Sequence, residues 1–156
     1  MSREQAAKTV ALLGAHRILT LATLRPDGWP QATIVGYAND GLRVYFMISR
    51  QSQKWTNLVR DPRVSIAIGA DTKDPMAIDG LSMAARAVEV TDPGELGRAR
   101  AAMLARYPEY AAWPESEILP MAMMRATPEI VSVLDYSKGF GHTELFRPEP
   151  DSVAAA

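Results

Sequence analysis

The sequence predicts a mainly β protein of the α+β class, an antiparallel barrel with short helices at its edges. Two observations support this: strand patterns follow one another through tight turns, and the helical patterns between them are short. Strands joined by tight turns must run antiparallel. About six or seven such strands, not separated by long helices, are typical of a barrel rather than a βαβ sheet.

Three strands are expected after an N-terminal helix. An apolar stripe ending near Gly14 predicts the helix over residues 3–15. Strands are predicted over residues 18–24, 29–38 and 42–49, joined by Arg25-Pro26-Asp27-Gly28 and by Asn39-Asp40-Gly41. In the third strand, one alternating set of side chains is apolar and faces the core: Leu42, Val44, Phe46 and Ile48.

The pattern changes from strand to helix where the third strand ends. Trp55, Leu58 and Val59 share one helical face, and Asp61-Pro62 ends the helix. Two hydroxyls and two cations stand at the junction: Ser49, Arg50, Ser52 and Lys54. Free backbone N–H groups and the helix dipole favour an anion at such a position. The junction is therefore a candidate phosphate site, and the alternative is a solvated helix N-terminus.

The second half of the chain predicts further strands and one long helix. Strands are expected over residues 64–68 and 78–91. Asp92, Pro93 and Glu95 then predict a helix to residue 106, with Glu95 completing a capping box. Residues 110–116 are expected to form a short helical piece. Two separate strands are predicted over residues 119–125 and 129–136.

Length and composition indicate one globular domain. The chain has 156 residues, a formal net charge of −1 and no cysteine. We expect a single domain over residues 1–146 and a flexible tail over residues 147–156. A balanced charge argues against general nucleic-acid binding. There is no signal-peptide pattern and no apolar run near the roughly 20 residues that span a membrane, so a cytoplasmic location without a membrane partner is expected.

Familiar catalytic motifs are missing from the sequence. There is no G-x-S-x-G elbow and no P-loop, and a metal site is not expected from His16 and His142 alone. The segment Gly139-Phe140-Gly141-His142 is predicted to be a surface turn. A role of His142 as an acid, a base or an axial ligand is left as an alternative. No catalytic residue is identified.

The order of these elements resembles the pyridoxamine 5'-phosphate oxidase-like family of flavin-binding split barrels. The segments LATLRPDGWPQAT and VYFMISRQSQKWTNLVRDPRVSIAI carry the resemblance, which covers roughly residues 5–135. It implies a six-stranded split β-barrel and a homodimer with FMN in clefts at the subunit interface. It also implies phosphate contacts at Ser49, Ser52 and Lys54, with Arg50 and Gln53 beside them. The ribityl chain and ring would lie along two strand segments: Thr33, Ile34, Val35 and Gly36, and Met47 and Ile48.

The activity that the resemblance implies is that of an FMN-dependent oxidoreductase. Hydride would pass through flavin N5 to or from a small substrate, and the protein would supply binding and orientation. The C-terminal segment YSKGFGHTELFRPEP does not match the basic residues with which the oxidase that names the family holds its substrate phosphate. Vitamin B6 oxidation is therefore not expected. Two alternatives are a non-catalytic flavin or haem carrier or sensor, and an F420-dependent reductase.

Overall fold

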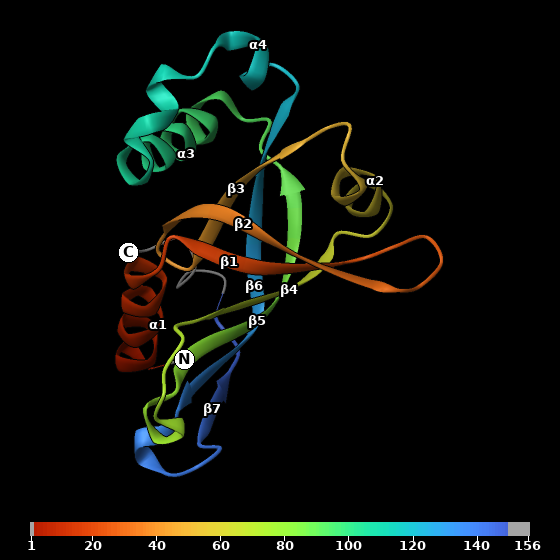
Figure 1. Ribbon diagram of the computed structural model, residues 1–156. Helices are drawn as coiled ribbons and strands as arrows, with labels where there is room; N and C mark the ends of the chain where they lie inside the picture. The colour runs from red at the N-terminus through yellow and green to blue at the C-terminus, as the bar shows by residue number, and fades with distance from the viewer. Residues whose placement is uncertain (1, 150–156) are drawn as a thin grey trace.

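Six strands close into an antiparallel barrel in the computed structural model, which describes residues 2–149 (Figure 1). The sheet order is β3-β2-β1-β4-β5-β6-β7, and pairing of β3 with β6 closes the barrel. β7 adds to the outer edge of β6. The strands are β1 Ile18–Leu24, β2 Pro30–Asp40, β3 Arg43–Ser49, β4 Arg63–Gly69, β5 Asp79–Glu89, β6 Met121–Asp135 and β7 Thr143–Phe146. The predicted fold class is confirmed.

Short helices stand around the barrel. The α-helices are α1 Arg3–Ala15, α2 Gln53–Arg60, α3 Pro93–Arg106 and α4 Glu115–Ile118, and the 3-10 turns are η1 Pro75–Ala77, η2 Pro108–Ala112 and η3 Tyr136–Lys138. Figure 1 shows α3 and α4 together at one end of the molecule, with α2 where β3 ends. No helix in residues 2–149 has the length and apolarity that crossing a membrane would require.

Apolar side chains fill the barrel and also a layer beneath α3. Inside the barrel, Val44 and Phe46 pack with side chains from every other barrel strand, and Leu13 of α1 and Leu58 of α2 join them. On the outer face of β3, Tyr45 packs with Met103 of α3 in a second apolar cluster. β3 is thus covered on both faces. This fixes the direction in which its last residues approach α2.

One strand prediction was wrong, and one strand was missed. β6 is continuous over residues 121–135, although it was expected as two strands. Its ladder with β5 shifts register at Ala84/Ala85, where Ala84 faces Ile130 and Ala85 faces Pro128. The proline lies at this irregularity, which accommodates its missing N–H without ending the strand. β7 was not predicted, and it is held by four-residue pairing with β6 and by the buried ring of Phe146.

The predicted capping box of α3 forms only in part. The carboxylate of Asp92 accepts the backbone N–H of Glu95 at 2.7 Å, as expected of an N-cap. The side chain of Glu95 instead accepts hydrogen bonds from Tyr45 and Arg125. Of the tail that was expected to be flexible, residues 150–156 lie outside the described residues.

Candidate functional site

The junction between β3 and α2 is built by two serines. The hydroxyl of Ser52 donates to the carbonyl of Ser49 at 2.7 Å and accepts the backbone N–H of Trp55 at 3.3 Å. Ser52 is thereby the N-cap of α2. The hydroxyl of Ser49 accepts the backbone N–H of Gln51 at 3.1 Å. These bonds hold the strand end and the helix start in one turn.

Hydrogen-bond donors remain free at the start of α2. The backbone N–H groups of Gln53 and Lys54 are the first two of the helix, and neither has an acceptor within the described residues. The ammonium group of Lys54 likewise has no ion-pair partner in residues 2–149. The junction therefore presents uncompensated positive charge, and the dipole of α2 adds to it.

An open cleft of about 280 Å³ extends from this junction along β2 and β3. Eight residues predicted to contact the cofactor line it: Ile34, Val35, Gly36, Met47, Ile48, Ser49, Ser52 and Lys54. Apolar atoms form the walls along the strands, and the hydroxyls and the ammonium group lie at the α2 end. Segments separated in the sequence are thus brought together in one amphipathic cleft.

Three of the predicted cofactor contacts do not line this cleft. Arg50 forms an ion pair with Glu89 at 2.5 Å, and its guanidinium lies 5.0 Å from the centroid of the Trp55 ring. Gln53 donates to the side chain of Asn57 at 3.0 Å. The hydroxyl of Thr33 is buried and has no hydrogen-bond partner within the described residues.

Four further residues line the cleft and were not singled out from the sequence: Met103, Tyr110, Trp113 and Met121. The rings of Tyr107, Tyr110 and Trp113 follow one another, with centroids 4.9 and 4.3 Å apart. The available signal was the i, i+3 spacing of aromatic side chains in YPEYAAW, a segment otherwise rich in small and polar residues. Burial, with Tyr107 and Glu109 nearby, raises the pKa of Tyr110, so its hydroxyl is neutral at the cleft wall.

Asn57 anchors α2 beneath the cleft. Its side chain is fully buried, and it donates to Thr23 at 2.9 Å and to Gln31 at 3.1 Å. A buried amide with satisfied bonds on two strands fixes the helix in register with them. Asn57 and the next residue, Leu58, thus have structural roles: Asn57 orients α2, and Leu58 fills the core.

His142 lies away from this cleft. It stands in the turn before β7, where Nε2 is 3.4 Å from a carboxylate oxygen of Glu144. Gly139 and Gly141 have positive φ angles in this turn, as expected of a glycine-rich surface turn. Figure 1 shows β7 and the turn before it at the end of the molecule opposite α3 and α4, well away from α2.

Comparisons with solved structures find the same fold. A heme-binding protein from Mycobacterium smegmatis is 27% identical with a TM-score of 0.79, and the match covers 99% of this chain and 62% of that protein. A conserved hypothetical protein from Mycobacterium tuberculosis is 27% identical with a TM-score of 0.73, with 97% and 94% covered. An FAD-binding protein from Mesorhizobium loti shares the fold at 22% identity and a TM-score of 0.66, with 82% and 90% covered.

The family comparison covers most of the chain. The model described as pyridoxamine 5'-phosphate oxidase matches residues 6–135, which include the whole barrel and the β3–α2 junction. This chain therefore belongs to the pyridoxamine 5'-phosphate oxidase family of split barrels.

Proposed function

We propose that this protein binds FMN in the cleft along β2 and β3 and is a flavin-dependent oxidoreductase acting on a small organic substrate. The observation that carries the proposal is the cleft itself, which combines apolar strand walls with free donors at the start of α2. An FMN molecule has a matching distribution: a flat aromatic ring system with apolar faces at one end and a charged phosphate at the other.

The residues at the α2 end fit a phosphate group. Lys54 would supply the charge, and the N–H groups of Gln53 and Lys54 would supply donors along the helix dipole. Ser49 would add a hydroxyl donor, whereas the hydroxyl of Ser52 already donates to the Ser49 carbonyl and would have to exchange that bond to reach the phosphate. Arg50 would contribute less than Lys54 to phosphate binding, because its charge is already compensated by Glu89.

The strand walls fit the rest of the cofactor. Ile34, Val35 and Met47 offer apolar contact along the strands. The side chain of Ile48 is buried in the barrel core, and the hydroxyl of Thr33 is buried on the side of the sheet opposite Ile34, so neither is assigned a side-chain contact with the cofactor. Bound flavin supplies hydride transfer at N5, and the protein's residues bind and orient it.

We also propose that the protein is a homodimer with the cofactor at the subunit interface. Across β2, β1, β4 and β5, the outer face carries two rows of small or apolar uncharged side chains: Ile34, Thr20, Ala67 and Ser82, and Ala32, Ala22, Ser65 and Ala84. Ile34 is 62% exposed and lies both in this face and in the cleft. A second copy covering this face would also close the open side of the cleft.

The absorbance spectrum of the full-length protein as isolated tests the cofactor. A flavin spectrum that bleaches with NADH or NADPH is expected, and colourless protein should recover it with added FMN. Riboflavin lacks the phosphate and should bind at least about tenfold more weakly than FMN, because it loses one or more charge-assisted hydrogen bonds. Equal affinity for FMN and riboflavin would contradict the proposal that the start of α2 binds the phosphate.

Haem is a second candidate, favoured by the 27% identity to the heme-binding protein from Mycobacterium smegmatis. Neither histidine lines the cleft in the described part of the chain. A Soret band in the isolated protein, without a flavin spectrum, would replace FMN by haem in this proposal. Colourless protein that ignores FMN but binds F420 would replace it by the deazaflavin.

A further inference from the structure

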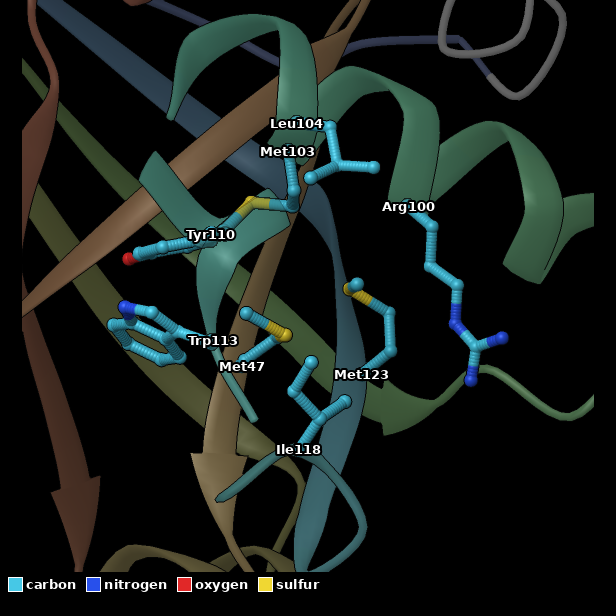
Figure 2. Close-up of a pocket in the computed structure, with 8 residues that line it drawn as sticks. All are labelled: Met47, Arg100, Met103, Leu104, Tyr110, Trp113, Ile118 and Met123. Atoms are coloured by element: carbon cyan, nitrogen blue, oxygen red, sulfur yellow. The ribbon is translucent and has the colours of Figure 1, made fainter. Parts of the chain in front are cut away.

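A smaller cavity of about 120 Å³ lies between α3, the α4 segment and the outer face of β3 and β6 (Figure 2). Three thioethers, Met47, Met103 and Met123, form much of its wall, and the rings of Tyr110 and Trp113 close one side. The wall atoms that face the cavity are nearly all apolar. No carboxylate of residues 2–149 lines it.

The size and lining of this cavity define what it can hold. An engineered apolar cavity of about 150 Å³ in another protein stays dry and takes up benzene. This cavity therefore fits one aromatic ring or a short branched alkyl group. Methionine side chains adjust their shape at low cost and contact aromatic edges favourably, so they suit a binding wall better than a rigid core.

One cation stands at the edge of the cavity. Arg100 has no ion-pair or hydrogen-bond partner in the described residues, whereas other arginines close to the barrel are engaged: Arg106 with Asn39, and Arg125 with Glu95. Figure 2 shows its guanidinium beyond Met123, on the side away from Tyr110 and Trp113. Its stem lines the cavity, so a ligand whose polar end extends out of the cavity past Met123 would meet this positive charge.

The other end of the cavity adjoins the open cleft along β2 and β3, where we propose that FMN binds. Met47, Met103, Tyr110 and Trp113 line both spaces, so only their side chains separate them. A ligand held by its anionic end at Arg100 would project its apolar group toward the proposed flavin site.

We propose that this cavity binds a small organic anion, with one aromatic ring or branched alkyl group in the cavity and a carboxylate at Arg100, and that this class contains the substrate. The assignment as substrate rests on the proposed flavin function. The binding site itself rests on the cavity and on Arg100. The two can fail separately.

The test compares 3-phenylpropanoate with uncharged 3-phenylpropan-1-ol by titration calorimetry, using full-length protein with and without FMN. Arg100→Gln should weaken binding of the acid roughly threefold to tenfold and change binding of the alcohol less than about twofold. The matched control is Arg98→Gln, an exposed arginine of α3 that does not line the cavity and should change neither. Ile118→Trp, which fills the cavity from the exposed α4 side, should weaken both ligands more than about tenfold.

The proposal would be overturned if neither compound bound at millimolar concentration. So would an Arg100→Gln variant that binds the acid as the wild type does. The FMN titrations of the same variants show that they are folded and report separately on the flavin site. Acid that binds, loses affinity in Arg100→Gln and yet leaves bound FMN and its reduction unchanged would remove the substrate assignment.

Discussion

The carboxylate of Glu95 lies 2.8 and 3.0 Å from Nη1 of Arg125, so the first turn of α3 is tied to the first half of β6. The hydroxyl of Tyr45 donates to the same carboxylate at 2.9 Å. The side chain of Glu95 is 10% exposed, which makes this a largely buried ion pair. It holds α3 against the barrel, and with it the wall that carries Met103 and Arg100.

This pair predicts an acid-sensitive stability. Burial opposes ionisation of Glu95, but the hydrogen bonds from Arg125 and Tyr45 outweigh it and lower the pKa of the carboxyl. Because the folded pKa is below the unfolded one, the stabilisation is present above the ordinary glutamate pKa of about 4.3 and is lost as pH falls through the folded value. Glu95→Gln should lower the free energy of unfolding at pH 7 by about 1–3 kcal/mol.

Urea unfolding at several pH values checks this prediction. The stability of Glu95→Gln should fall less between pH 7 and pH 3 than that of the wild type. Glu117→Gln, an exposed glutamate of α4, is the matched control and should follow the wild type. Parallel pH profiles for the wild type and Glu95→Gln would show that this carboxylate is not the source of the acid sensitivity.

The second prediction concerns Lys54 and the affinity of the proposed site for the FMN phosphate. Lys54→Ala should weaken FMN by about 1–3 kcal/mol, the range for a charge-assisted hydrogen bond, and should leave riboflavin nearly unchanged. Calorimetry with both ligands measures this difference. Lys73→Ala removes an exposed lysine from the loop after β4 and serves as the control. If Lys54→Ala binds FMN as tightly as the wild type, Lys54 does not contact the phosphate.

The sequence predicted elements where local patterns decided them. The period-2 alternation of Leu42 to Ile48 and the Asp61-Pro62 stop both depend on neighbouring residues, and both are confirmed. β6 was wrongly divided because Pro128 is a breaker by propensity, whereas pairing with β5 on one side carries the strand through it. β7 depends on pairing with β6, which no local pattern reveals.

The site was predictable in the same measure. Ser49, Ser52 and Lys54 lie close together in the sequence, between the end of β3 and the start of α2, so their spacing alone predicted that they share one site. Arg50 belongs to the same turn but pairs with Glu89, a residue of β5 whose approach is set by the barrel. Met103, Tyr110 and Trp113 reach the cleft only because α3 and η2 fold over β3, a tertiary arrangement without a sequence motif.

A charge introduced on the outer face of β1 and β4 should dissociate the proposed dimer. Ala67→Glu places a carboxylate among small uncharged side chains, and its burial against a second copy would leave that charge unpaired. We expect sedimentation to shift toward the monomer and FMN affinity to fall with it. Ala101→Glu on the exposed side of α3 is the control and should change neither. A variant that stays dimeric would place the interface elsewhere.

The last prediction concerns Gly36, where close packing beneath the cleft leaves little room for a side chain. A Cβ at this position would lie 3.0 Å from the hydroxyl oxygen of Tyr107 and 3.1 Å from Cζ. Tyr107 cannot easily move, because its hydroxyl accepts the backbone N–H of Tyr37 and donates to the carbonyl of Arg17. The guanidinium of Arg17 also lies 4.7 Å from the centroid of its ring. Gly36→Ala should therefore destabilise the protein by about 1–3 kcal/mol, the usual cost of overpacking.

Thermal unfolding of Gly36→Ala, Tyr107→Phe, the double variant and a control tests whether this constraint is the contact with the hydroxyl of Tyr107. In a Tyr107→Phe background the hydroxyl is gone, so Gly36→Ala should cost less than in the wild type, a coupling that a double-mutant cycle measures. Gly97→Ala in α3 meets nothing within 4 Å and should stabilise by up to about 1 kcal/mol through helix propensity. Additive effects of Gly36→Ala and Tyr107→Phe would mean that the hydroxyl oxygen of Tyr107 is not the atom that limits a side chain at position 36.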